Sequence, residues 1–415
     1  MRGFLTDERG VALPMAMLAL LILSTVMIGF SVLGATEPII ANNQLMATQA
    51  RALAEAGVER AIWALNNPAD PKGVPSGGPT PPPYDGSQLI PVSAGVNTLG
   101  GFRVAVTDGA SPAERVITST GWVPNDTTSN PKAHQRITVT VINPQRLFTN
   151  PPAALAVRGE LQVGGNSLVD SRGDTSCGKK VGALSTGATS LQGNAAEILG
   201  ATDSNDVPNE VTSAHNGPLP ASAHDIVTNL ATPAFDQFSW TDAAIDSLRA
   251  YAKARGTYRQ GQVDFDTNNR MPNGLIFVDT VSGRHITLEG VTPATPVADF
   301  ANVTIHDNAA ADPSGILSGW LFVNGSLSIN ANFKMHGLIY TQNDMSYRGA
   351  GAGGISGVAI SRNIRDTSVT SIDSDLLGTA NVAYHCQNAK TGGGTIPHRW
   401  TVKSGTYREI CDSCT

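Results

Sequence analysis

Residues 10–36 read GVALPMAMLALLILSTVMIGFSVLGAT, without one charged side chain. A helix of roughly 20 apolar residues can cross the hydrocarbon core of a bilayer, so this stretch predicts a membrane-spanning helix over residues 11–36. The helical pattern continues through NNQLMATQARALAEAGVERAIWALNN and stops before Pro68. We therefore predict one continuous helix over residues 11–67. Its length from Pro14 to Asn66 would be about 80 Å. Such a rod needs a membrane or other helices to cover it.

The second half of this helix carries small and apolar residues at spacings of three and four. Ala50, Leu53, Gly57 and Ala61 follow that spacing, which places them on one face. We therefore expect these four residues to pack against a partner, and we assign Met15, in the apolar half, to helix packing as well.

A short charged leader, MRGFLTDERG, precedes the apolar stretch. Arg2 and Arg9 lie before the span and Glu37 is the first charge after it, which predicts a cytoplasmic N-terminus. A secretory signal peptide has a shorter apolar region than this one. A leader that ends in glycine resembles class III signal sequences, which prepilin peptidase cuts after the glycine. This resemblance predicts cleavage between Gly10 and Val11, and a generic signal-anchor is the alternative.

Two quoted segments carry a closer resemblance. RGVALPMAMLALLILSTVMIG (residues 9–29), followed by QARALAEAGVERAIWAL (residues 49–65), resembles the N-terminal domain of PilX-type minor pilins of type IV pilus systems. The resemblance covers about residues 8–67 and is most specific at AEAGVERA. Major pilins begin with Phe and carry Glu at the fifth mature position, where this chain has Val11 and Met15. That departure argues against a bulk-filament role and is shared with K-type minor pseudopilins of type II secretion.

The resemblance implies a structural role rather than an enzymatic one. It implies a minor subunit that primes or tips a type IV pilus or related filament and acts in pilus assembly and adhesion. The implied partners are other pilins and minor pilins, prepilin peptidase, the inner-membrane assembly platform and, before assembly, membrane lipid. The precursor would lie in the inner membrane, with residues 37–67 and the C-terminal domain in the periplasm. The methylated mature protein would then move to the pilus or cell surface.

The composition favours β structure beyond the helix. Charged residues make up 15% of the chain and 43 residues are glycine, a balance typical of all-β or repeat architecture. We therefore predict an α+β, mainly β fold. The formal charge of −6, with no Lys/Arg-rich run, argues against nucleic acid as a partner.

Three regions follow the helix. Residues 68–100 open with a Pro/Gly-rich segment that predicts a linker. Residues 101–146 contain GFRVAVTDG, ERVITSTGWV and HQRITVTVIN, whose alternation predicts a small antiparallel sheet packed on the long helix. Residues 150–415 then form the largest region.

Residues 150–415 have the pattern of a degenerate repeat. AVRGELQVGGNSLV (residues 156–169) aligns without a gap on FVNGSLSINANFKM (residues 322–335). Glycine followed by three mostly apolar residues begins at Gly274, Gly319, Gly337 and Gly357. Short strands with glycines recurring at roughly twenty residues predict a parallel β-helix, with a β-sandwich as the alternative. One helix, over residues 239–256, interrupts the region, starting at Ser239 or Thr241 and ending at Gly256. Its predicted apolar stripe consists of Ala244, Ile245, Leu248, Tyr251 and Ala252.

The four cysteines are Cys177, Cys386, Cys411 and Cys414. Their wide spacing in a chain with an export signal predicts disulfides, and we favour Cys386 with Cys411. A zinc site that adds His385, or a redox CxxC site, is the alternative.

Candidate chemistry is otherwise sparse. Asp203, Asp206 and Glu210 cluster oxygen ligands that could bind calcium, but they lack the glycine and spacing of an EF-hand loop, so a solvated loop is the preferred interpretation. We expect no other cofactor and no catalytic residues. Two alternatives to the pilin hypothesis stay open: an anchored adhesive β-helix that does not polymerise, and a carbohydrate-active β-helix enzyme with acidic residues along one groove.

Overall fold

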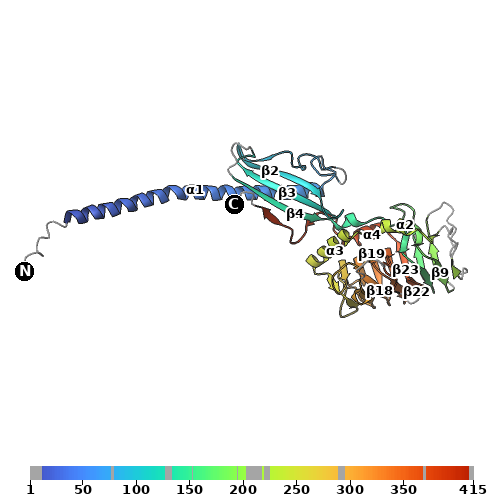
Figure 1. Cartoon of the computed structure of the whole chain (residues 1–415). Helices are drawn as coiled ribbons and strands as arrows, with labels where there is room; N and C mark the ends of the chain where they lie inside the picture. The colour runs from blue at the N-terminus through green and yellow to red at the C-terminus, as the bar shows by residue number, and fades with distance from the viewer. Residues whose placement is uncertain are drawn as a thin grey trace, which may run out of the picture. The chain divides into compact units, whose positions relative to one another are not determined.

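The computed structural model describes residues 12–410 apart from 76–78, 127–132, 152, 194, 202–216, 219–224, 288–294 and 368–370. The described chain forms two compact units. The first contains residues 12–107, 117–139 and 407–410, and the second contains residues 108–116 and 140–406. The predicted fold class, α+β and mainly β, is confirmed: a long N-terminal helix, an antiparallel sheet and many parallel strands (Figure 1).

The first helix, α1 (Ala12–Asn66), runs unbroken for 55 residues. At 1.5 Å per residue it is about 80 Å long. Pro14 lies in its first turn, where the backbone N–H groups have no helical partner in any case. The helix ends where Asn67 Nδ2 donates to the Trp63 carbonyl at 2.7 Å, immediately before Pro68.

The antiparallel sheet begins earlier than predicted. It contains β1 (Ile90–Ala94), β2 (Asn97–Asp108), β3 (Glu114–Val123) and β4 (Ala133–Ile142) in that order. Residues 90–100, assigned to the linker, therefore form β1 and the start of β2. The Pro/Gly-rich stretch that predicted the linker ends before β1, and Pro91 is compatible with a strand because β1 lies at the edge of the sheet.

We predicted that the solenoid extends to residue 415, but the strands after residue 400 do not belong to it. Instead β24 (Thr401–Val402) and β25 (Arg408–Ile410) pair antiparallel with β4. The register places Thr401 opposite Ile142 and Arg408 opposite Thr138. The solenoid is thus inserted in the chain between β4 and its late partner strands, a connection that no local pattern reveals.

Two sheets form the solenoid, and the strand pairs described within them are all parallel except β11 with β9, so the predicted parallel β-helix replaces the β-sandwich alternative. The first sheet comprises β5 (Ala153–Val157), β7 (Leu168–Asp170), β8 (Val181–Ser185), β10 (Glu197–Leu199), β12 (Ile226–Val227), β13 (Tyr258–Gln260), β15 (Gly274–Asp279), β17 (Ile316–Val323), β19 (Lys334–Thr341), β21 (Gly354–Ser361) and β23 (Asn381–Tyr384). The second comprises β6 (Leu161–Gly164), β9 (Thr189–Gln192), β11 (Gly217–Pro218), β14 (Gln262–Phe265), β16 (Ala301–Ile305), β18 (Gly325–Ile329), β20 (Met345–Gly349) and β22 (Ser374–Gly378). The helical segments of this region are η2 (Pro144–Leu147) before β5, α2 (Thr232–Phe235), η3 (Asp236–Phe238) and α3 (Asp242–Arg255) between β12 and β13, η4 (Val297–Asp299) between β15 and β16, and α4 (Cys386–Thr391) after β23.

The order of the coils differs from the order of the chain. The second sheet runs β14-β16-β18-β20-β22-β6-β9-β11, so the first coil after the antiparallel sheet stacks on the last coil of the chain. In the first sheet, β21 pairs through Ile355 with β23 and through Ala359 with β5. The strands β23 and β5 therefore both pair with β21, β23 with its first part and β5 with its last part. Together they form the strand position of the next coil.

The glycines identified in the sequence form one column. Gly274 is opposite Gly319, Gly319 opposite Gly337, and Gly337 opposite Gly357. A side chain at Gly319 would collide with the backbone of Gly274, and the loop after α4 passes close to Gly319 at Gly392. The repeat therefore marks a place where backbone must approach backbone.

Helix α3 has the predicted ends and the predicted apolar stripe. The Thr241 side chain accepts a hydrogen bond from Ala244 N, and Gly256 adopts the left-handed conformation at the C-cap. The buried residues of the stripe are Ala244, Ile245, Leu248, Tyr251 and Ala252. They cover β13 and β15 at one end of the first sheet.

Candidate functional site

The first half of α1 presents apolar side chains that the described part of the chain leaves exposed. From Leu13 to Leu45 its large hydrophobic side chains are between 46% and 74% exposed, and Met15 is 70% exposed. Residues 12–36 contain no charged group, and the helix is long and apolar enough to cross a membrane. Exposure of this much contiguous apolar surface marks an interaction site, with lipid or with other protein.

The second half of α1 packs on the antiparallel sheet. Ala50, Leu53, Gly57 and Ala61, which the spacing predicted to share a face, are all buried. A side chain at Gly57 would meet Ser119 Oγ and the Phe102 ring, because helix and sheet approach closely there. The two halves of one helix thus have different environments, one packed and one open.

The last strand also contacts this half of the helix. Arg51 pairs with Glu409 of β25 at 2.7 Å and with Glu55 at 3.1 Å. Tyr407 Oη lies 3.3 Å from Glu55 Oε1. Sequence reasoning missed these contacts, because nothing near residue 407 indicates a partner more than three hundred residues earlier.

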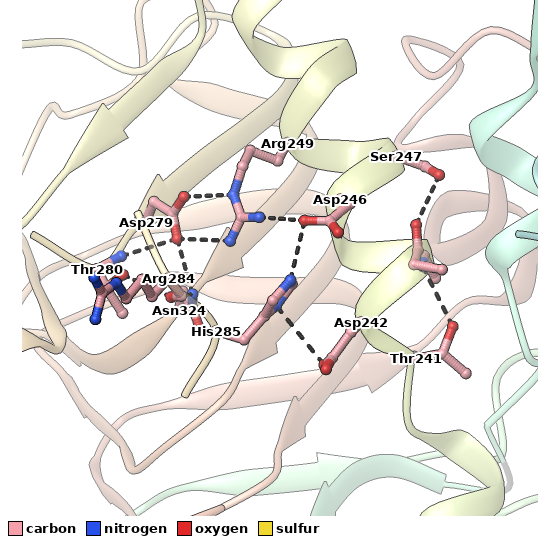
Figure 2. Close-up of polar contacts among 12 residues, drawn as sticks. Thr241, Asp242, Asp246, Ser247, Arg249, Asp279, Thr280, Arg284, His285 and Asn324 are labelled. Carbon is pink, nitrogen blue, oxygen red and sulfur yellow. Dashed lines mark hydrogen bonds and ion pairs between the residues drawn. The ribbon is translucent and has the colours of Figure 1, made fainter. Parts of the chain in front are cut away.

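A polar cluster holds α3 on the solenoid (Figure 2). The Asp279 carboxylate is fully buried and accepts hydrogen bonds from Arg249 Nε at 2.6 Å and from Asn324 Nδ2 at 2.8 Å. Tyr258 Oη donates to it at 3.0 Å, and burial beside this carboxylate raises the pKa of Tyr258 to about 12. Arg249, Asn324 and Tyr258 come from three different segments and meet at this carboxylate, so the cluster joins α3 to the first sheet.

The same cluster reaches the solvent through two acidic residues of α3. Asp246 contacts Arg249 and lies 3.0 Å from His285 Nε2, while Asp242 lies 3.7 Å from His285 Nδ1 (Figure 2). Asp246 is 54% exposed. Solvent screens pairs of this kind, so the loss of one exposed partner costs less stability than the loss of one partner from the buried pair.

Acidic residues that the sequence analysis did not single out gather along one groove of the second sheet. Asp344, Asp373, Asp375 and Arg348 line it. Burial raises the pKa of Asp344 to about 7, and the charges of Asp373 and Asp366 add to this effect, whereas the hydrogen bond from Thr367 at 2.9 Å opposes it. Burial also raises the pKa of Asp373. Their sequence positions are unremarkable, and only the stacking of β20 on β22 brings them together.

The disulfide pairing we favoured is wrong. Cys386 is bonded to Cys177, across 209 residues, and both lie in the solenoid. The bond ties the coil that follows β5 to α4, where early and late segments of the solenoid meet. The spacing of the cysteines in the sequence does not reveal which coils are neighbours in the solenoid, so it could not identify this pair. His385 instead caps α4, accepting at Nδ1 from Asn388 N at 3.2 Å.

Several predicted sites lie outside the described residues. These are the cleavage position Gly10–Val11, the calcium candidates Asp203, Asp206 and Glu210, and the cysteines Cys411 and Cys414. Among the residues that the structure describes, no group of three or more His, Cys, Asp or Glu side chains is placed to hold a metal ion.

Comparison with known proteins gives no family. No family model matches the chain, and no curated protein matches it. Among solved structures, competence-associated pilin ComZ from Thermus thermophilus is similar at 12% identity, over 88% of this chain and 97% of that one, with a TM-score of 0.23. A glycosylated ice-binding protein from an Arctic yeast is similar at 14% identity, over 58% of this chain and 93% of that one, with a TM-score of 0.25.

An ice-binding protein from the Antarctic ascomycete Antarctomyces psychrotrophicus is also similar, at 8% identity over 57% of this chain and 96% of that one, with a TM-score of 0.21. TM-scores this low carry no argument for a shared fold or function. The class of protein is therefore defined by the structure itself: a mainly β protein with a long, half-exposed N-terminal helix and an inserted parallel β-solenoid.

Proposed function

We propose that this chain is a pilin-like structural protein, a minor subunit that primes or tips a type IV pilus or related filament. The observation that carries the proposal is the division of α1 into an open apolar half and a half packed on an antiparallel sheet. A helix without charged residues is stable in lipid, and a bundle of similar helices can cover the same surface after assembly. Its resemblance to PilX-type minor pilins over residues 8–67 supports the same role.

The proposal also names partners and places. Prepilin peptidase would process the precursor in the inner membrane, and other pilins and minor pilins would take the place of lipid around α1 as the assembly platform raises it. The solenoid, held outside the helical core, would then act at the pilus or cell surface, in adhesion rather than catalysis. An anchored surface protein that never polymerises is the competing function.

A charge placed in the open half of α1 tests this proposal. Leu21 is 65% exposed, and a lysine at the centre of a span costs about 3 kcal/mol of insertion free energy. We expect Leu21→Lys to remove the protein from filaments sheared off the cells, with the membrane fraction reduced as well. The control is Ala52→Lys, on the exposed side of the packed half, which should leave both fractions unchanged.

Immunoblots of the sheared and membrane fractions give the answer. Wild-type protein that is present in membranes and absent from sheared filaments would contradict the filament role and support the anchored alternative.

A further inference from the structure

A groove of about 460 Å³ crosses the outer face of the second sheet. The strands β18, β20, β22 and β6 form it, and their outward side chains stack in register. Ser328 is opposite Ser346, Ser346 opposite Asp375, and Asp375 opposite Gln162. Neighbouring strands lie about 4.8 Å apart, so these groups form an evenly spaced polar row. A volume in this range is typical of small-molecule sites.

The row keeps hydrogen-bonding capacity for a ligand. Within the described part of the chain, no hydrogen bond is formed by the side chains of Ser346 and Gln162. Asp375 and Arg348 form an ion pair at 3.6 Å, with the arginine side chain 65% exposed. An acceptor and a multiple donor therefore stand side by side at the solvent surface, an arrangement that suits adjacent hydroxyl groups.

Apolar surface flanks the polar row. Ile372 and Leu377 line the groove and are half-buried. A ligand that matches the whole groove therefore needs hydroxyl groups on its edges and C–H surface on its faces. Sugars combine these two properties.

We propose that this groove binds a neutral oligosaccharide. Asp344, Asp373 and Asp375 face one arginine, so the groove disfavours anionic chains such as nucleic acid or acidic polysaccharide. Asp373 is already engaged, because its two oxygens accept hydrogen bonds from Glu160 N at 2.6 Å and Asn363 Nδ2 at 2.5 Å. A cation would therefore find few free ligands. A peptide strand would need an open sheet edge, whereas the groove lies on a sheet face.

The proposal concerns the solenoid alone and holds whether or not α1 enters a filament. Its test uses the full-length chain in lipid nanodiscs, free of sugar-based detergents, and isothermal titration calorimetry. The probes are cellohexaose, maltohexaose and laminarihexaose, with hexagalacturonate and calcium chloride as the acidic and cationic alternatives. The variants are Ser346→Trp, which fills the groove from an outward position, and Asp375→Ala, which removes the acceptor.

The matched control is Asp264→Ala. Asp264 is exposed in the same outward row, on β14, and lies outside the groove. We expect at least one neutral hexasaccharide to bind, and each groove variant to weaken that binding about tenfold or more, with the control unchanged. Melting temperatures identify any variant that misfolds, and the other groove variant then decides the result.

Three results would overturn the proposal. One is the absence of binding to all three neutral hexasaccharides at millimolar concentration. Another is neutral-sugar binding that both folded groove variants retain. The last is binding restricted to hexagalacturonate or calcium.

Discussion

At the scale of single residues, Asp279 is the group on which the packing of α3 depends most directly. Its carboxylate is buried and receives donors from α3, from β13 and from the turn at Asn324. A buried ion pair contributes little net stability when intact, but the loss of one partner leaves the other charge uncompensated. Arg249, only 12% exposed, would lose its buried partner and keep only Asp246, whose charge solvent screens.

We therefore expect Asp279→Asn to lower the free energy of unfolding of the solenoid by about 3–5 kcal/mol. Asp246→Asn is the matched control, because Asp246 contacts the same arginine from an exposed position and should cost less than about 1 kcal/mol. Urea titration monitored by circular dichroism measures both. Equal losses in the two variants would contradict the structural role assigned to Asp279.

Asp344 gives the solenoid a pH dependence of defined sign. Its pKa in the fold, about 7, lies above the value of about 3.9 for an unfolded chain. The folded state therefore binds this proton more tightly. The stability that protonation contributes is complete below the unfolded pKa and is lost as the pH rises through about 7.

The Asp344→Asn variant, which does not titrate, should remove this dependence. We expect its unfolding free energy, relative to the wild type, to rise by about 4 kcal/mol between pH 4 and pH 8. Thermal melts across that range test the prediction. A difference between variant and wild type that stays constant with pH would show that Asp344 is ionised throughout.

At the scale of elements, the contact between α1 and the antiparallel sheet requires a residue without a side chain at Gly57. A methyl group there would meet Ser119 and Phe102. Overpacking a close contact typically costs about 1–3 kcal/mol, although alanine favours a helix more than glycine does. We expect Gly57→Ala to lower the melting temperature, with Glu59→Ala, on the exposed side, as the control. An unchanged or higher melting temperature for Gly57→Ala would contradict the close packing.

Local patterns predicted several elements correctly. The ends and stripe of α3 follow from Thr241, Gly256 and the spacing of its apolar residues, all within 18 positions. The glycine column at Gly319, Gly337 and Gly357 was visible because each coil repeats the same local need. These features depend on neighbours in sequence or on a regular period.

Features that depend on distant partners could not be predicted. Each coil of the solenoid presents similar edges, so nothing local specifies that β5 joins β21 and β23 rather than starting a stack of its own. The same applies to the Cys177–Cys386 bond, to the pairing of β25 with β4 and to the groove around Asp375. In each case the contacting segments are far apart in the sequence, and their separation does not follow the repeat length of the solenoid.

At the scale of the whole molecule, the chain leaves the antiparallel sheet after β4, forms the solenoid and returns to pair with β4 through β24 and β25. An insertion of this kind lets a large domain be added without changing the helix-bearing unit. In the role we propose, assembly would depend on α1 in the first unit and ligand binding on the groove in the second. The account depends on α1 being processed as a pilin helix.

The N-terminal sequence of the mature protein tests that claim most directly. Mass spectrometry of the protein recovered from membranes, with and without prepilin peptidase, identifies its first residue. The account predicts a chain that begins at Val11, with a methylated amine, only when the peptidase is present. A chain that still begins at Met1, or one cut near Ala35 whether or not the peptidase is present, would contradict the pilin pathway.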